Sequence, residues 1–271
     1  MKWLPGRELA AAIRAEVAEL AAAGAPPRLA VVTATADPAS AWYVRSIAAA
    51  TAKAGIGCDV VEVAASAAAV SAALARLSAD PAVHGIILAT PLPEGTSLAE
   101  LAGGIDVSKD VDGANPVSLG RLTAGLPAFA PATAEAVIAL LDHYGVAISG
   151  RRAVVVGRSV VVGKPVAQLL LDRDATVTIC HSRTPDLASV TRQADILVVA
   201  AGRAGLIGPS HVAPGAVVID VGTSPGPDGS VVGDVDPAVT AAALSPVPGG
   251  VGPVTTAILL RHVAAAASRH P

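Results

Sequence analysis

The sequence predicts a two-domain α/β protein with mainly parallel sheets, and three observations support this fold class. The chain has 271 residues, which is enough for two domains of moderate size. Hydrophobic residues make up 52% of it and charged residues only 15%, so an intrinsically disordered chain is excluded. Apolar segments of strand length alternate with amphipathic helical segments, which is the pattern of right-handed βαβ units.

The first half of the chain predicts one α/β domain. Apolar side chains recur at helical spacing over residues 7–23, so this domain begins with an amphipathic helix. A buried strand is expected at residues 28–35, where most side chains are apolar. The elements expected after it are a helix at 40–55, a strand at 58–63, a helix at 69–78 and a strand at 83–88.

The same alternation restarts near Pro131 and predicts a small Rossmann-like domain. Residues 153–156 are Ala-Val-Val-Val, as expected for a strand that is covered on both faces. The other elements expected here are helices at 134–144, 165–171 and 187–193 and strands at 175–180, 196–200 and 216–221. A last helix at 255–268 is expected to pack back on the first domain. The predicted domains are therefore 1–134 with 255–271, and 135–254.

Composition and charge argue against several classes of function. The formal net charge is −3 with no basic stripe, which argues against nucleic acid as a partner. The apolar runs fall far short of the ~20 residues of a membrane span, and charged residues within the first 20 positions argue against a signal peptide. We therefore expect a soluble, cytoplasmic protein with no membrane partner.

The cysteines and histidines predict no metal site. Cys58 and Cys180 lie far apart, with no CxxC motif and no cysteine–histidine clustering. The histidines have no mutual ligand spacing either. For His262, as for most of the others, we expect a position at the surface or at the end of a strand.

The stretch that follows residues 153–156 is the most informative. Gly157, Arg158 and Ser159 form a turn, and Gly163 and Pro165 lie at the start of the next predicted helix. A strand, a tight turn and a helix N-terminus form the context in which backbone N–H groups bind a pyrophosphate. The spacing G-x5-G differs from the common G-x-G-x-x-G, so an ordinary βα turn is the alternative interpretation of this segment taken alone.

The residues after the next strand favour NADP over NAD. An NAD site would have Asp or Glu about 20 residues past the first glycine, where it binds the ribose 2′-hydroxyl. Here the segment is His181-Ser182-Arg183, and the first carboxylate after it is Asp186. The guanidinium groups of Arg183 and Arg158 suit a 2′-phosphate, although a solvated loop charge is the alternative for Arg183. His181 is a further candidate for lining the cofactor pocket.

Five motifs that run along almost the whole chain share their order and spacing with one enzyme family. They are Asp37-Pro-Ala-Ser-Ala-Trp-Tyr43-Val44, Pro91-Leu-Pro93, Lys109-Asp-Val-Asp112-Gly113 with Gly120-Arg-Leu122, Gly157-Arg-Ser159 with Val162-Gly-Lys-Pro165, and Pro246-Val-Pro-Gly-Gly-Val-Gly-Pro253. Together they resemble the bifunctional methylenetetrahydrofolate dehydrogenase/methenyltetrahydrofolate cyclohydrolase family, and the last motif is the most specific.

The resemblance implies a folate-binding catalytic domain, a Rossmann domain that binds NADP, a C-terminal helix that returns to the first domain, and a homodimer. It implies that Tyr43 stacks near the folate ring system and that Asp112 accepts hydrogen bonds from the pterin. A carboxylate suits those N–H donors, although a turn-capping role is the alternative for Asp112. The residues implied to form a wall near the folate are Pro248, Gly249, Gly250, Val251 and Gly252.

Two of the predicted catalytic positions depart from the family pattern. Ile47 lies four residues after Tyr43, where the family has Lys, and Ala89 lies two residues before Pro91, where the family has Gln. The resemblance assigns these two polar groups to proton handling and water activation at the reacting carbon. Ile and Ala side chains form no hydrogen bonds, so both roles are vacant. Neutral drift in an alanine-rich chain is the alternative explanation.

These residues predict an NADP-dependent 5,10-methylenetetrahydrofolate dehydrogenase whose cyclohydrolase activity is weak or lost. Hydride transfer chiefly needs positioning, whereas hydrolysis needs general acid–base help, typically worth about 10²–10⁴-fold. Two alternatives stay open. One is an NADP-dependent oxidoreductase for another folate-like or imine substrate, and the other is a non-catalytic protein that binds folate or NADP.

Overall fold

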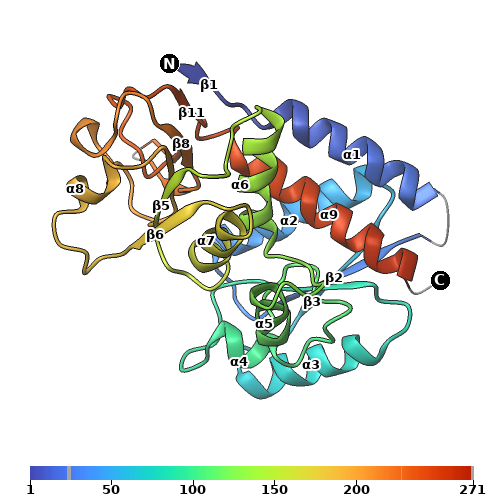
Figure 1. The fold of residues 1–271 in the computed structure, drawn as a ribbon. Coiled ribbons are helices and arrows are strands. Elements are labelled where there is room, and N and C mark those ends of the chain that lie inside the picture. Colours follow the sequence, from blue (N-terminus) through green and yellow to red (C-terminus); the bar gives the residue numbers. More distant parts are fainter. Residues whose placement is uncertain (23–25, 227, 270–271) are drawn as a thin grey trace. The chain divides into compact units, whose positions relative to one another are not determined.

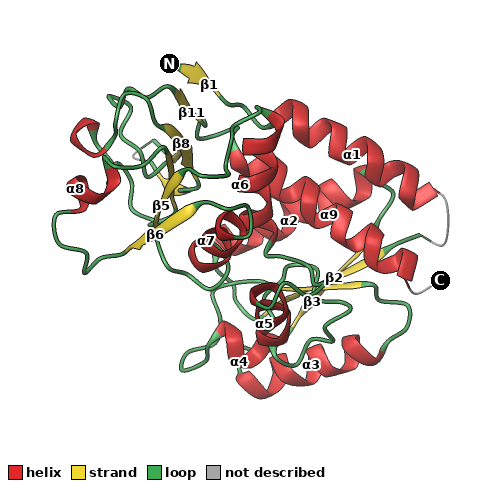
Figure 2. Cartoon of the chain, in the orientation of Figure 1, coloured by secondary structure: helices red, strands yellow, loops and turns green. Residues whose placement is uncertain are grey.

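The computed structural model describes residues 1–22, 26–226 and 228–269, which form two compact units. Unit 1 consists of Met1–Ala10 and Thr133–Thr255, and unit 2 consists of Ala11–Ala132 and Thr256–Pro271. Figure 1 labels the elements of both units along the chain, and Figure 2 shows their helices and strands. The two-domain α/β fold class predicted from the sequence is confirmed.

Unit 1 contains a parallel sheet with the strand order β1-β11-β8-β7-β5-β6, which confirms the predicted Rossmann-like domain. The strands are β1 (Lys2–Trp3), β5 (Arg152–Val156), β6 (Thr176–Cys180), β7 (Ile196–Val199), β8 (Val217–Asp220) and β11 (Ala243–Leu244). The helices are α6 (Ala132–His143), α7 (Gly163–Leu171) and α8 (Leu187–Thr191), with the 3-10 turn η1 (Pro209–His211). A short antiparallel pair joins β9 (Ser224–Pro225) to β10 (Val231–Val232).

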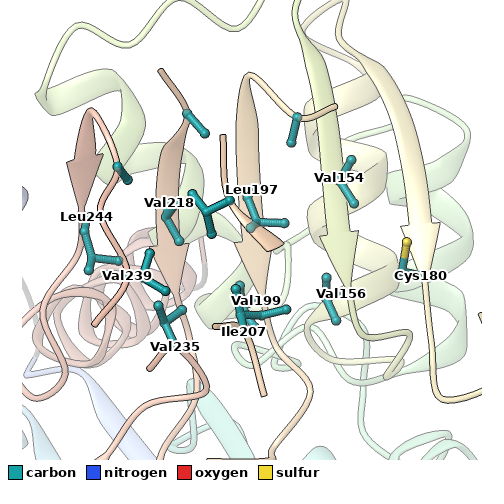
Figure 3. Packing of buried hydrophobic residues seen from close by; sticks show 14 residues of the cluster. Val154, Val156, Cys180, Leu197, Val199, Ile207, Val218, Val235, Val239 and Leu244 are labelled. Atoms are coloured by element: carbon teal, nitrogen blue, oxygen red, sulfur yellow. The ribbon is translucent and has the colours of Figure 1, made fainter. Parts of the chain in front are cut away.

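Alternate residues of the parallel strands build the core of unit 1. Val154 and Val156 of β5 and Leu197 and Val199 of β7 are buried, and each pair points to one face of the sheet because side chains alternate along a strand. Figure 3 shows them packed with Ile207 and with other apolar side chains of the same cluster. The core is thus aliphatic, as the low aromatic content of 2% requires.

Unit 2 contains a parallel sheet in the order β3-β2-β4. Its strands are β2 (Arg28–Thr33), β3 (Gly57–Glu62) and β4 (Gly85–Leu88). Its helices are α2 (Pro38–Lys53), α3 (Ala67–Ala79), α4 (Leu98–Ala102) and α5 (Pro116–Thr123), with most of α1 (Arg7–Ala22) and α9 (Val251–Arg269). Each predicted element of this half is present within a few residues of its expected bounds. The expected end of the first helix, Ala23, lies outside the described residues.

The C-terminal helix α9 returns to unit 2, as predicted, because residues 256–269 belong to that unit. Its length and composition alone would let it cross a membrane, but 56% of its most apolar 18-residue stretch is buried inside the structure. The buried core helix of a soluble protein can have the same length and composition. The helix therefore gives no support to a membrane span.

Candidate functional site

The turn at residues 109–113 carries two carboxylates with different roles. The Asp110 side chain is 0% exposed and accepts the backbone N–H groups of Ala114 (3.0 Å) and Asn115 (2.9 Å). The Asp112 side chain is half-buried and has no hydrogen bond within the described part of the chain. Turn capping, the alternative considered for Asp112, is therefore performed by Asp110. The Asp112 carboxylate is left available for a ligand.

Several contacts hold this turn in one conformation. Lys109 is buried, and its Nζ donates to the carbonyl oxygens of Ser78 (2.8 Å) and Asp80 (2.6 Å) at the end of α3. Gly113 has a φ of 63°, and a Cβ atom on it would lie 2.5 Å from the backbone nitrogen of Pro131. Only glycine fits this position, because it combines a left-handed backbone with direct packing on another segment.

The electrostatic environment of Asp112 moves its titration toward neutral pH. The pKa of the Asp112 carboxyl is raised to about 7, mainly by burial and in addition by the neighbouring charge of Asp110, while His262 opposes both effects. Burial also raises the pKa of Asp110, while hydrogen bonds from the N–H groups of Asn115 and Ala114 oppose that shift. Asp112 can therefore change its charge in the pH range in which most enzymes work.

Tyr43 lies close enough to Asp112 for the two side chains to interact electrostatically. Tyr43 belongs to α2, which begins after Asp37, whose Oδ2 accepts the N–H of Ser40 at 2.8 Å. Although 38% of the Tyr43 side chain is exposed, burial raises the pKa of its hydroxyl, and the Asp112 charge adds to the shift. The structure therefore brings the phenol and the carboxylate to one region of unit 2.

The two positions that depart from the family pattern are buried and apolar. Ile47 lies on α2 one helical turn after Tyr43, and its side chain is 1% exposed. Ala89 directly follows β4, donates its N–H to the carbonyl oxygen of Val32 at 2.8 Å, and is 2% exposed. Neither side chain can give or take a proton.

The segment predicted to form a wall near the folate belongs to unit 1 in the structure. Gly249 has a φ of 105°, and its carbonyl oxygen accepts the N–H of Gly6 at 2.8 Å. The next N–H, of Gly250, is donated to Pro246 O at 2.8 Å, and Val251 opens α9. Pro248 follows a cis peptide bond, and Gly252 lies in the first turn of α9. The role of these residues toward a folate stays a prediction.

The predicted dinucleotide turn is closely packed in unit 1. Gly157 follows β5 with a φ of 131°, and a Cβ atom on it would collide with the carbonyl oxygen of Ala200. A Cβ on Gly163 would in turn collide with the carbonyl oxygen of Gly157. The two glycines therefore let the backbone of β5, the turn and the start of α7 approach one another, as a backbone cradle for a pyrophosphate requires.

Ser159 lies four residues before α7, and its hydroxyl reaches the N-terminus of that helix. Its Oγ accepts the N–H groups of Val162 (3.2 Å) and Gly163 (3.3 Å), while Val162 itself provides no side-chain cap. A hydroxyl that accepts these bonds still has its own hydrogen to donate. Ser159 can therefore both cap the helix and donate to an anion.

The loop after β6 carries the residues expected near a 2′-phosphate. His181 is half-buried, and its Nδ1 accepts the N–H of Arg183 at 3.2 Å. The side chains of Ser182, Arg183 and Arg158 are exposed. Within residues 1–22, 26–226 and 228–269, neither guanidinium forms an ion pair with a carboxylate. Their predicted role in cofactor binding is compatible with this exposure and stays a prediction.

Sequence analysis missed a buried carboxylate that shapes the same region of unit 1. Asp234 is fully buried and accepts three consecutive N–H groups, of Ala201 (2.7 Å), Gly202 (2.8 Å) and Arg203 (2.7 Å). This loop follows Ala200, whose carbonyl oxygen packs on Gly157. In the sequence, Asp234 is marked only by its place next to Gly233 after a short apolar segment. This local pattern does not indicate that its hydrogen-bond partners lie more than thirty residues away.

The expectation for His262 was wrong. The imidazole is 5% exposed on α9 and lies neither at the surface nor at a strand end. Its Nδ1 is 2.8 Å from the carbonyl oxygen of Val111, the residue before Asp112. An apolar helix that packs inside unit 2 carries this imidazole into the interior, and a hydrogen bond to the backbone satisfies it.

Comparison with known proteins identifies relatives over the full length of the chain. Residues 4–112 match the model of the tetrahydrofolate dehydrogenase/cyclohydrolase catalytic domain, and residues 131–271 match that of the NAD(P)-binding domain of the same family. The Bifunctional protein FolD 1 of Saccharopolyspora erythraea is 63% identical over 99% of this chain and 94% of its own length. That of Rhodococcus jostii is 60% identical over 97% of this chain and 92% of its own.

Solved structures give the same result. The bifunctional FolD enzyme of Campylobacter jejuni has a TM-score of 0.95 and 38% identity, with all of both chains covered. The Trypanosoma brucei methylenetetrahydrofolate dehydrogenase-cyclohydrolase, solved with NADP and an inhibitor, has a TM-score of 0.91 and 38% identity. It covers 98% of this chain and 96% of its own.

The packing at Gly163 predicts that this glycine is required for dinucleotide binding. A Gly163→Ala variant should bind NADPH at least about tenfold more weakly. The added methyl group would collide with backbone atoms of Gly157 and Arg158, so the backbone of the turn itself has to move. Fluorescence titration measures the affinity, and thermal melting shows whether the variant is folded. The matched control is Gly215→Ala, where the methyl meets open space. Equal NADPH affinity in the two variants would contradict the assignment of this turn.

Proposed function

Because the chain belongs to the tetrahydrofolate dehydrogenase/cyclohydrolase family, we propose that it oxidises 5,10-methylenetetrahydrofolate to the 5,10-methenyl form with NADP+, and has little or no cyclohydrolase activity. The observation that carries the proposal is the contrast within unit 2. Asp112 and Tyr43 are present, while Ile47 and Ala89 place buried apolar side chains where the resemblance expects Lys and Gln.

The residues of unit 2 bind and orient the folate in this proposal. The ionised Asp112 carboxylate accepts two N–H groups from the aminopyrimidinone edge of the pterin, and the Tyr43 ring lies near the ring system. The turn at residues 109–113 needs no rearrangement, because Asp110 and Gly113 already fix it. Preorganisation of this kind lowers the barrier to a reaction that depends on distance and orientation.

The residues of unit 1 hold the cofactor. The turn between Gly157 and Gly163 would hold the pyrophosphate, and the guanidinium groups of Arg158 and Arg183 would hold the 2′-phosphate that distinguishes NADP from NAD. When bound, NADP+ supplies the acceptor for the hydride that leaves the methylene carbon. The two nitrogens that flank this carbon stabilise the cation that develops there, so no side chain has to move a proton.

Hydrolysis of the methenyl product makes a different demand. A water molecule must lose a proton as it attacks the carbon, and a ring nitrogen must then gain one. Side chains that carry protons typically speed such a step by about 10²–10⁴-fold. The side chains of Ile47 and Ala89 can neither accept the proton of the water nor donate a proton to the ring nitrogen. The reaction of the proposed enzyme therefore ends at the methenyl compound.

We propose further that the protein acts in the cytoplasm as a homodimer. Cys58 and Cys180 are free thiols, which suits a reducing compartment such as the cytoplasm, and the family resemblance implies the dimer. Light scattering on the purified protein measures the oligomeric state directly.

The proposal predicts which product accumulates and which substitutions change it. With 5,10-methylenetetrahydrofolate and NADP+, the parent protein should accumulate the methenyl product, and Ile47→Lys combined with Ala89→Gln should raise its hydrolysis about 10²-fold. Absorbance of the methenyl compound and of NADPH follows the two steps. Ile47→Met, which keeps an apolar side chain, is the control and should leave hydrolysis unchanged.

Other outcomes of this experiment contradict the proposal. Rapid formation of 10-formyltetrahydrofolate by the parent protein would show that another group activates water. Binding of both ligands without turnover would favour a non-catalytic binding protein. Because a lysine at the buried position 47 costs stability, thermal melting accompanies the assay, and Ala89→Gln alone provides a second, milder variant.

The raised pKa of Asp112, to about 7, predicts that folate affinity depends on pH. Below pH 7 the carboxyl becomes protonated and loses an acceptor site for the pterin N–H groups, so the Kd should be about tenfold higher at pH 6 than at pH 8. Calorimetry with 5-formyltetrahydrofolate, which has the same pterin edge, measures this. Asp112→Asn should bind weakly and independently of pH. Glu94→Gln, at an exposed carboxylate, should keep the parent profile, whereas a flat profile in the parent protein would refute the role of Asp112.

A further inference from the structure

The imidazole of His262 forms a hydrogen bond with the turn that carries Asp112. Its Nδ1 lies 2.8 Å from the carbonyl oxygen of Val111, across 151 positions of sequence. A carbonyl oxygen only accepts hydrogen bonds, so Nδ1 carries the hydrogen in this contact. The imidazole of His262 therefore donates this hydrogen bond to the turn.

The segment at residues 129–131 braces both the imidazole and the turn. The Phe129 ring packs on the His262 ring with a centroid distance of 4.7 Å and an interplanar angle of 34°. The backbone of the same segment packs on Gly113, directly after Asp112. The Arg269 guanidinium also packs on Phe129, 5.0 Å from the ring centroid. The same segment therefore contacts the imidazole through the Phe129 ring and the turn through its backbone.

The charges around Asp112 are of both signs. Asp110 is a second carboxylate in the same turn, and the Tyr43 hydroxyl also interacts with Asp112. His262 is the group that opposes these effects, and it interacts electrostatically with both carboxylates. An imidazole can switch between neutral and cationic forms at physiological pH, which makes it suited to balance a carboxylate that binds a ligand.

We propose that His262 is a positioning residue for Asp112: it holds the turn through the Val111 carbonyl, and it places a side chain that can carry a positive charge near the carboxylate proposed to bind the pterin. This inference rests on the proposed folate role of Asp112. It assigns His262 no contact with the folate and no proton transfer in the reaction.

Two substitutions separate the hydrogen bond from the charge. In His262→Asn the side-chain amide can still donate to the Val111 carbonyl but cannot become a cation, whereas His262→Leu removes both functions. The titration of Asp112 is followed by carboxyl ¹³C NMR in the protein without ligands, with the signal assigned by its loss in Asp112→Asn. His143→Asn is the matched control, at an exposed histidine of α6.

The His262→Asn variant should raise the midpoint of the Asp112 titration by about one pH unit, since a nearby positive charge is lost. Its KM for the folate should rise about twofold at pH 8 and about fivefold at pH 7, because a smaller fraction of Asp112 is then ionised. In His262→Leu the KM should rise about tenfold at both pH values with little change in kcat, because the turn loses a buried hydrogen bond.

An unchanged Asp112 midpoint in His262→Asn would overturn the proposal, as would a midpoint that moves equally in His143→Asn. A loss of stability with an unmoved midpoint would show a purely structural histidine. The NMR titration needs neither folate nor turnover. It therefore distinguishes failure of this inference from failure of the proposed function, which would appear as absent folate binding in the parent protein.

Discussion

The hydrogen bonding of the buried Asp110 carboxylate is the interaction on which the proposed folate-binding region of unit 2 depends. A carboxylate removed from water is costly unless hydrogen bonds compensate it, and here the N–H groups of Ala114 and Asn115 do so. The backbone of the turn has to adopt the one conformation that provides them. As a result, Asp112 is presented without an intramolecular hydrogen-bond partner in the described structure, and its carboxylate is kept for a ligand.

Unit 1 uses the same physical device. The buried carboxylate of Asp234 binds three consecutive backbone N–H groups after Ala200, and the Ala200 carbonyl packs on Gly157 of the proposed dinucleotide turn. Buried acids thus hold the loops of both units by their backbones. Rigid loops are what a hydride transfer requires from a protein, because the reaction depends on position rather than on proton movement. Ile47 and Ala89 are compatible with such an enzyme and poorly suited to one that must activate water.

Much of this arrangement could be predicted from the sequence because it follows from local patterns. Valine-rich runs identified β5 and β7, and helical periodicity placed Ile47 one turn after Tyr43 on α2. The pairing of β1 with β11 could not be predicted, since each strand has two residues and leaves no periodicity. The roles of the two acids in Asp-Val-Asp-Gly were also ambiguous. Only the positions of the Ala114 and Asn115 N–H groups show that Asp110 caps the turn.

The long-range contacts were beyond sequence reasoning for a different reason. His262 and Val111 are brought together by the return of α9 to unit 2, and nothing near His262 in the sequence indicates its partner. An isolated histidine in an apolar helix is compatible with many environments. The three-dimensional structure is needed to show that His262 contacts Val111, the residue next to the proposed folate ligand Asp112.

The most direct test of the account uses 5,10-methenyltetrahydrofolate as the sole substrate, without NADP. Its decay is followed by absorbance at several concentrations of the protein, with buffer alone as the reference. The account predicts a decay rate equal to that in buffer at every protein concentration, because no side chain at positions 47 and 89 can move a proton. A rate that rises in proportion to the protein concentration would contradict it.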